Sequence, residues 1–191
     1  MHHGYEDQDV AFSTAHATLN LGFLTIVQES NGYLGGYLVT NQWGRPLEFR
    51  LSSAVQPNRV QQILYGGTLQ PYICADLIGK TLVDKTGTAV QCILTDCEAA
   101  LDLRLDIDVP VVWVAPAKDP VAEDLAEEGA CIRLERQSHG LLIHHPRFHS
   151  DAAAIRELLD HLDTGLEMAE PFTRIREALA EARKMGVTSR A

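Results

Sequence analysis

The pattern of apolar and polar positions predicts three strands near the start of the chain. The expected strands cover residues 18–28, 33–41 and 46–52. Asn31-Gly32 lies between the first two, and this dipeptide is a strong signal for a tight turn. The third stretch alternates with a period of two, as a strand does when one face is exposed. We therefore predict an antiparallel meander, in which Gly35-Gly36 indicates a bulge or a close backbone approach.

After residue 56 the apolar spacing becomes that of helices separated by strands. Pro57 and Pro71 are expected to open helices over 58–65 and 72–84, because a proline's missing N–H does no harm in a first turn. Gly66-Gly67 is expected to end the first of them. Next come a strand around Cys92, a helix over 98–104, and a wholly apolar run at 111–114. That last run is typical of a strand inside a parallel sheet.

The last third of the chain predicts a short helix, a hairpin and two more helices. Asp119-Pro120 is a helix-start signature, and the two apolar runs at 131–136 and 141–145 indicate a hairpin. Ser150 is expected to cap the first of the two final helices, which is expected to end at Gly165, and Pro171 is expected to open the last one. The last one carries a narrow apolar stripe at regular helical spacing, formed by Phe172, Ile175, Leu179 and Ala182.

Together these elements predict an α/β fold built on a mixed sheet. The sheet has an N-terminal antiparallel three-stranded meander and a parallel β-α-β portion, and a C-terminal hairpin and helical pair follow. We expect a flexible arm over residues 1–16, an α/β domain over 17–149, and a helical pair over 150–191. The helical pair packs on the domain or on a partner.

The composition bounds the class of protein. The chain has 191 residues, of which 46% are hydrophobic and 22% charged, and a net charge of −10. Such an acidic chain lacks the electrostatic footprint of a general phosphate-backbone binder, so nucleic acid is an unexpected partner. No signal peptide or membrane span is visible. The four cysteines form no C-x-x-C pair, which favours reduced thiols and a cytoplasmic protein.

One strand ends at an acidic residue and turns directly into a helix. This is the segment Thr95-Asp96-Cys97-Glu98, and ligands gather at the carboxyl ends of such strands in open α/β sheets. A meander, a helix and then a strand ending in Thr-Asp resembles the RNase H-like arrangement over about residues 17–115. The resemblance implies a metal-dependent nuclease or phosphodiesterase, whose carboxylates hold divalent ions. Asp96 and Asp76 match two of its acidic positions.

The first strand departs from that pattern, because it carries no acid between Thr18 and Gln28. Glu29 at its end, or Glu98, would have to complete the carboxylate set. The nuclease interpretation therefore requires Asp76 and Asp96 to lie on the same face of the sheet. The competing interpretation, which we favour, is that Asp96 caps the helix that begins near Glu98.

Histidines and cysteines supply two further candidate sites. His144, His149 and Cys131 are zinc-ligand types, with His139, His145 and Asp151 close in sequence. Adjacent residues of a strand point to opposite faces, so we favour surface histidines over a zinc-stabilised module. Cys97 lies at a helix start, where the dipole lowers a thiol pKa. Its acidic neighbours act in the opposite direction, which argues against a cysteine enzyme.

No complete catalytic set and no cofactor motif emerge from the sequence. We therefore expect a non-enzymatic interaction or assembly subunit of a cytosolic complex, which binds another protein or a second copy of itself. No cofactor is expected, except a divalent metal if the nuclease alternative holds. The expected contact residues lie on the last helix and among the aromatic side chains of loops: Phe172, Ile175, Leu179, Tyr65 and Trp43.

Overall fold

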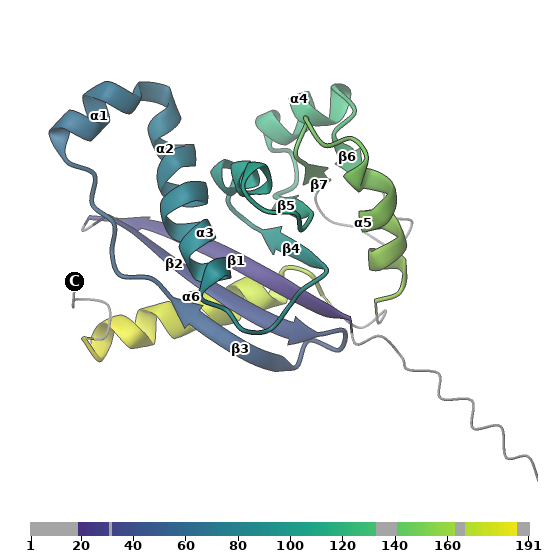
Figure 1. Cartoon of the computed structure of the whole chain (residues 1–191), viewed down its shortest axis with the longest axis horizontal. Coiled ribbons are helices and arrows are strands. Elements are labelled where there is room, and N and C mark those ends of the chain that lie inside the picture. Colours follow the sequence, from purple (N-terminus) through teal and green to yellow (C-terminus); the bar gives the residue numbers. More distant parts are fainter. Residues whose placement is uncertain (1–18, 31, 133–140, 163–166, 187–191) are drawn as a thin grey trace, which may run out of the picture.

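The computed structural model describes residues 19–30, 32–132, 141–162 and 167–186, and its centre is one mixed sheet (Figure 1). Seven strands form this sheet in the order β3-β2-β1-β4-β5-β7-β6. The strands are β1 (Asn20–Glu29), β2 (Gly32–Asn41), β3 (Pro46–Leu51), β4 (Cys92–Thr95), β5 (Val111–Ala115), β6 (Cys131–Ile132) and β7 (Leu141–His144).

The pairing confirms the predicted fold class. β1, β2 and β3 form the antiparallel meander, while β1–β4 and β4–β5 are parallel pairs. β7 is antiparallel to both β5 and β6, so the C-terminal hairpin also forms. The succession β3-β2-β1-β4-β5 is the RNase H-like order that the sequence resembles. The predicted turn of the hairpin, with His139, lies outside the described residues, as do the arm over 1–16 and Gly165.

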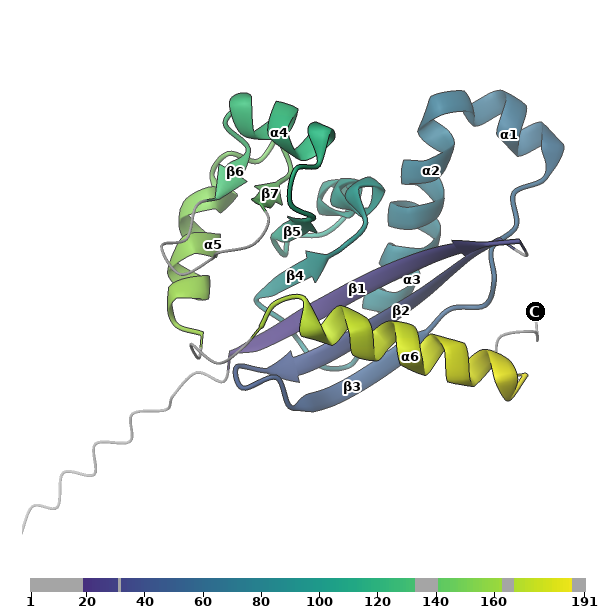
Figure 2. The same cartoon turned by 180° about the vertical axis from the view of Figure 1, so that it is seen from behind.

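Helices cover both faces of the sheet (Figures 1 and 2). The helical segments are α1 (Arg59–Tyr65), η1 (Gly66–Thr68), α2 (Leu69–Pro71), η2 (Tyr72–Gly79), α3 (Lys80–Asp84), η3 (Glu98–Leu105), α4 (Pro120–Glu127), α5 (Asp151–Asp160) and α6 (Glu170–Lys184). η2, η3 and α4 bury one apolar cluster with Leu24 and Ile93, which we call the η2 face. α5 and α6 bury the other cluster with Phe23 and Leu94, which we call the α6 face.

Gly35 and Gly36 allow helices to approach β2 closely from both sides. A Cβ on Gly35 would lie 2.2 Å from Cγ2 of Ile78, and one on Gly36 would lie 2.5 Å from Cγ2 of Ile175. Both separations are far shorter than a van der Waals contact. The predicted close approach is therefore confirmed, whereas the register shift of this strand falls at Val39 and Thr40.

The helical region after the meander differs from the prediction. Asn58, and not Pro57, begins α1, through a capping box in which Asn58 and Gln61 exchange two hydrogen bonds of 2.9 Å. Gly66 and Gly67 do not end the helical path, which continues through a 3₁₀ turn to Asp84. Pro71 is the last residue of α2, where the path changes to the π-turns of η2.

The later helices begin where the sequence predicts. The Asp119 side chain accepts from the backbone N–H groups of Val121 and Ala122 at the start of α4, which confirms the cap. Ser150 occupies the N-cap position of α5, but its side chain makes no capping hydrogen bond, so the expected cap is wrong. Pro171 lies in the first turn of α6. Within the described part of the chain, no helix has the length and apolar character that a membrane crossing requires.

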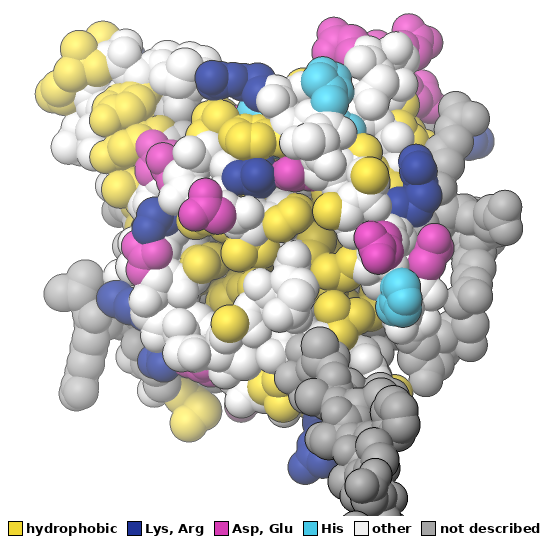
Figure 3. All heavy atoms as spheres, turned by 45° about the vertical axis from the view of Figure 1, so that its right-hand side comes forward, with side chains coloured by type: hydrophobic (Ala, Val, Ile, Leu, Met, Phe, Trp, Pro, Cys, Tyr) yellow, Lys and Arg dark blue, Asp and Glu magenta, His cyan; other side chains and the backbone are white. Residues whose placement is uncertain are grey.

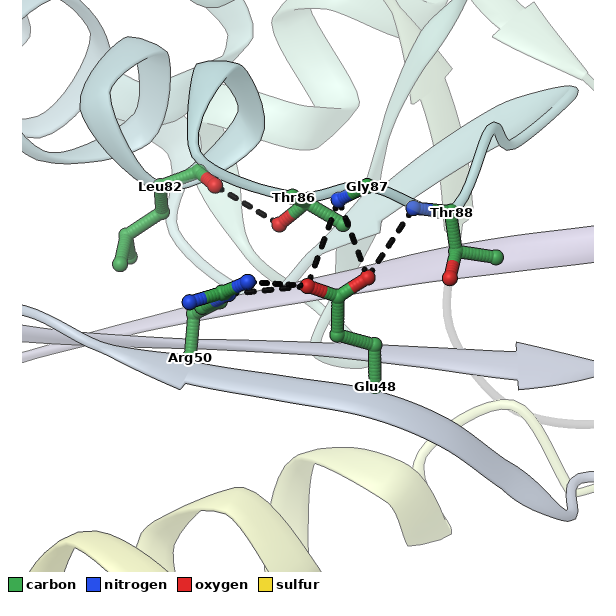
Figure 4. Close-up of polar contacts among 6 residues, drawn as sticks. All are labelled: Glu48, Arg50, Leu82, Thr86, Gly87 and Thr88. Atoms are coloured by element: carbon green, nitrogen blue, oxygen red, sulfur yellow. Dashed lines mark hydrogen bonds and ion pairs between the residues drawn. The ribbon is translucent and has the colours of Figure 1, made fainter.

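Glu48 ties the loop before β4 to the edge strand β3 (Figure 4). Its carboxylate accepts from the backbone N–H groups of Gly87 and Thr88 at 3.1 and 3.0 Å. Arg50 donates to the same carboxylate at 2.9 and 2.7 Å. The Arg50 guanidinium, with the Thr88 and Gly87 contacts, lowers the pKa of Glu48 to about 2. The start of β4 is thereby held against the meander.

Candidate functional site

Asp96 lies at the carboxyl end of β4 beside the neighbouring strand β1. The parallel register pairs Thr95 with Leu24, so the next residues, Asp96 and Thr25, are also neighbours. The fully buried Thr25 hydroxyl donates to Oδ2 of Asp96 over 3.4 Å. The guanidinium of Arg176 on α6 forms an ion pair with the same oxygen. One carboxylate, one hydroxyl and one guanidinium therefore meet at this edge, and we call them the Asp96 site.

The three side chains differ in their access to solvent. The Asp96 side chain is 12% exposed, whereas that of Arg176 is 51% exposed. Burial raises the pKa of Asp96, although Arg176 and the Thr25 hydroxyl act in the opposite direction. The carboxylate is thus desolvated, and its partner guanidinium reaches the surface. Shifted acids of this kind are common at functional sites, and they also occur in structural ion pairs.

Asp96 does not cap the following helix, so this expectation is wrong. The residue at the N-cap of η3 is Cys97, whose backbone N–H donates to Oγ1 of Thr95 at 3.2 Å. The Asp96 carboxylate is directed to Thr25 and Arg176 instead. The side chain that the sequence assigned to local capping therefore joins β4 to two distant elements.

The structure does not bring Asp76 to Asp96. Side chains of β1 alternate between the two faces, so Thr25 lies on the α6 face, as Phe23 does. Asp96 contacts Arg176 on that same face. Asp76 lies on η2, which packs against the opposite face. Desolvation and then the charges of Asp106 and Asp102 raise the pKa of Asp76. Asp76 and Asp96 therefore lie on opposite faces of the sheet.

The other two candidate acids are engaged elsewhere. Glu98 is an exposed residue whose pKa is raised by desolvation and by the charges of Asp102 and Asp119. Glu29 forms an ion pair with Arg183, further along α6. The carboxylate set that the resemblance implies is not assembled among these residues.

A divalent-ion centre of the RNase H-like kind does not fit the Asp96 site. Such a centre needs several carboxylates around the ions, and here the neighbours of Asp96 are a hydroxyl and a cation. In the described ranges, no three His, Cys, Asp or Glu side chains are placed to share a metal ion. The chemistry of this site must therefore be derived from its own side chains.

The predicted histidine and cysteine ligands are only partly brought together. The rings of His144 and His149 lie 5.8 Å apart, edge to face, and the buried Nε2 of His144 makes no hydrogen bond. Cys131 is paired with Ile143 and packs on the η2 face. His144, the next residue along β7, is directed to the opposite side. His145 contacts Asp102 instead, at 3.4 Å.

The predicted contact residues do not share one surface. Phe172, Ile175 and Leu179 are at most 2% exposed, because this stripe of α6 is covered by the chain's own sheet. Trp43 is 66% exposed, in the turn after β2. Tyr65 lies near the other end of the meander, where it stacks on Tyr72 with ring centres 4.3 Å apart. That end also carries the exposed apolar side chains of α1 (Figure 3, upper left).

Of the comparisons with known proteins, the one with solved structures finds a similar fold. No protein-family model and no curated protein matches the chain. Among solved structures, the chain is similar to endonuclease V from Ciona intestinalis in complex with DNA. The identity is 12%, the match covers 86% of this chain and 87% of that chain, and the TM-score is 0.45. A likeness at this level transfers no activity to the present chain.

Two expectations from the sequence are nevertheless contradicted and are withdrawn. The matched protein is a nuclease, and not a non-enzymatic assembly subunit. It is bound to DNA, whereas nucleic acid was the partner that the acidic composition argued against. Net charge describes the whole surface and cannot report a local site, which is why this argument from composition was too broad.

Sequence reasoning missed two members of the Asp96 site, Thr25 and Arg176. Thr25 carried a usable signal, because it is a polar residue within an apolar strand next to β4 in the RNase H-like order. Arg176 carried none, because its contact with Asp96 spans 80 residues and depends on how α6 crosses the sheet.

Proposed function

We propose that the chain is a nuclease-like hydrolase that acts on a phosphodiester of a nucleic-acid strand at the Asp96 site. The observation that carries the proposal is the pairing of a desolvated carboxylate with a half-exposed guanidinium at the carboxyl end of β4. Ligands of open α/β sheets bind at such strand ends. A phosphodiester group is an anion that the guanidinium would hold.

Each side chain has a task in this reaction. Arg176 presents a planar fork of N–H donors, which suits two oxygens of one phosphate. Asp96, whose pKa is raised by burial, accepts a proton from a water molecule. The water oxygen bonds to phosphorus as the ester bond breaks, the leaving oxygen takes a proton from solvent, and Asp96 then releases its proton to solvent. Thr25 holds the carboxylate in position through its hydroxyl.

The charge of the chain limits the expected binding mode. With 16 basic and 26 acidic residues, the protein has no excess of cations for a long phosphate backbone. Contact is therefore expected with one or two phosphates around Arg176. For a single strand, each neutralised phosphate contributes a slope of about −0.7 to log K against log salt. Binding should thus weaken with salt much less steeply than for a basic nuclease.

The test is cleavage of end-labelled single-stranded DNA, duplex DNA and single-stranded RNA by the full chain. Asp96→Asn should abolish cleavage, and Arg176→Gln should weaken substrate binding. Arg183→Gln is a matched control, because Arg183 is on the same helix and also pairs with a carboxylate of the sheet. It should keep the wild-type rate. A chelator should not stop the reaction, since the described donors do not form a metal set.

Cleavage that survives Asp96→Asn, or that is lost equally in Arg183→Gln, would contradict the proposal.

A second candidate is binding of a strand without hydrolysis. It is favoured by Arg176, which neutralises the acid, and by a hydroxyl in place of a second carboxylate. Strand binding that depends on Arg176, without cleavage of any substrate, would select this candidate.

A cytoplasmic location stays part of the proposal, supported by four free cysteines.

A further inference from the structure

β3 forms one edge of the sheet, and its outer side is open among the described residues. It is the first strand in the sheet order, and β2 is the one strand that pairs with it (Figures 1 and 2). Ser52, directly after β3, donates its N–H to the Gly35 carbonyl of β2 at 2.9 Å. Because successive residues of an edge strand point their backbone groups to opposite sides, those of Phe49 and Leu51 point away from β2. Such backbone groups are a template for pairing with another strand.

An exposed aromatic side chain lies in the middle of this edge. Phe49 is 37% exposed, and it pairs with Leu38, whose side chain is part of the cluster of the α6 face. α6 crosses that face over β1 and β2. Leu51 lies two residues after Phe49 and packs against the same cluster. The edge therefore offers apolar surface beside α6 as well as backbone donors and acceptors.

Only the beginning of β3 is protected against strand pairing. Pro46 lacks an N–H, and the register against β2 shifts between Val39 and Thr40, where their partners are Glu48 and Pro46. Prolines and register shifts are common devices that blunt an edge strand. Both features lie before Phe49. The part of β3 that remains regular and open is short, and it covers residues 48–51.

We propose that two copies of this chain associate through β3, paired antiparallel about a two-fold axis at Phe49. In this register Phe49 lies opposite the partner's Phe49, and the two residues exchange N–H and C=O groups across the axis. Glu48 lies opposite the partner's Arg50, and Arg50 lies opposite the partner's Glu48. The contact uses the same edge of both copies, so it closes at two chains and does not extend into a fibre.

The charges on β3 select this register. Glu48 and Arg50 pair with Val39 and Tyr37, so both lie on the η2 face. Residues directly opposite on an antiparallel pair have Cβ atoms about 4.5–5.5 Å apart, where opposite charges stabilise the pair and like charges destabilise it. An axis at Arg50 would set two guanidinium groups opposite each other, and an axis at Glu48 would do the same with two carboxylates. The axis at Phe49 sets each carboxylate opposite a guanidinium.

The distribution of acids along the chain also favours a second copy at this edge. With a net charge of −10, two copies repel each other over most of their surfaces. Glu48 is, however, the one acidic residue between Glu29 and Asp76, a stretch that contains all of β2 and β3. Arg50 binds Glu48 within its own chain at 2.7 Å and keeps 47% of its side chain exposed. The four charges would form one network across the axis.

This interface differs from the one that the sequence suggested, since the apolar stripe of α6 is buried by the chain's own sheet. It also does not depend on the proposed hydrolase function. β4, which carries Asp96, lies three strands away from β3 in the sheet order. Association is measured without a nucleic acid, so either proposal can fail while the other holds.

The experiment is sedimentation velocity of the full chain at increasing concentration. The mass should rise from the 21.0 kDa of one chain towards twice that value, and no further. Phe49→Asp should weaken the association by about tenfold or more, because two carboxylates would then face each other across the axis. Leu64→Asp is the matched control. It adds the same charge at a side chain that is 75% exposed on α1, and it should associate as wild type does.

A charge reversal tests the register itself. Arg50→Glu alone and Glu48→Arg alone each place like charges opposite each other, so each folded variant should stay monomeric. An equimolar mixture of the two variants should form a heterodimer, because opposite charges then meet at both contacts. If Glu48→Arg does not fold by circular dichroism, the comparison of Phe49→Asp with Leu64→Asp still decides.

Three results would overturn the proposal. The first is wild type that remains monomeric at every concentration. The second is a dimer that persists in Phe49→Asp or is lost equally in Leu64→Asp, since another surface would then hold the copies together. The third is a mixture of the two folded charge variants in which no heterodimer forms.

Discussion

Replacing Phe172 by alanine should loosen α6 and cost a large part of the stability. Phe172 is 2% exposed and meets Phe23 of β1 edge to face, with ring centres 5.6 Å apart. It lies one helical turn before Arg176, so the same change also loosens the guanidinium at Asp96. The perturbation thus reports whether α6 belongs to the folded core or is free for a partner.

The magnitude follows from what is removed. Truncating a buried phenylalanine to alanine costs about 3–5 kcal/mol, through lost transfer energy and the cavity that remains. Within that range, the edge-to-face pair contributes about 0.5–1.5 kcal/mol beyond area burial. With an m-value of about 2 kcal/mol per molar urea, the midpoint should fall by roughly 1.5–2.5 M. Phe172→Leu should cost much less, because it keeps most of the volume.

The assay is urea unfolding followed by far-ultraviolet circular dichroism. Ile63→Ala on α1 is the control, because its side chain is 65% exposed and the change should stay within about 0.5 kcal/mol. A midpoint for Phe172→Ala that matches this control would contradict the packing of α6 on the sheet. It would mean that α6 does not pack on the sheet in solution.

Three further predictions concern acids and the missing carboxylate. Burial raises the pKa of Asp96, so ionisation of this carboxyl destabilises the folded state once the pH exceeds the pKa of the unfolded chain. Asp96→Asn should therefore be more stable than wild type at neutral pH, and thermal unfolding at acidic pH should show no difference between the two proteins. Because the fold lowers the pKa of Glu48, its contribution to the free energy of unfolding is complete above about pH 4.5 and is lost as the pH falls towards about 2. Glu48→Gln should therefore speed hydrogen exchange at the Gly87 and Thr88 amides, and unchanged rates would contradict the loop contact. Thr25→Asp should introduce manganese binding that calorimetry detects and wild type lacks, because it places a second carboxylate beside Asp96.

The elements that sequence patterns predicted well are those whose burial depends on one local period. β1, β2 and β3 alternate or are continuously apolar, and their boundaries agree with the structure to within two residues. The Asp119 cap of α4 is likewise a local signal. Gly66-Gly67 misled the prediction because glycines usually end a helix, and Pro71 misled it because a proline is typical of a first turn, so a new helix was expected there. Here a 3₁₀ turn and π-turns carry the path past them.

The candidate site was predictable only in its position. Asp96 could be placed at a strand end from the apolar run before it, but its partners depend on tertiary packing. The register of β1 against β4 selects Thr25, and the crossing of α6 selects Arg176. Asp76 was placed on a helix correctly, but the sequence did not show on which face of the sheet that helix lies.

Asp96 is proposed to act on a phosphodiester that Arg176 holds. The most direct measurement is the cleavage rate of an end-labelled single strand by wild type, Asp96→Asn and Arg183→Gln, each shown to be folded by circular dichroism. Wild type and Arg183→Gln should cleave the strand, and Asp96→Asn should not. Equal rates in all three proteins, or no cleavage by wild type on any strand, would contradict it.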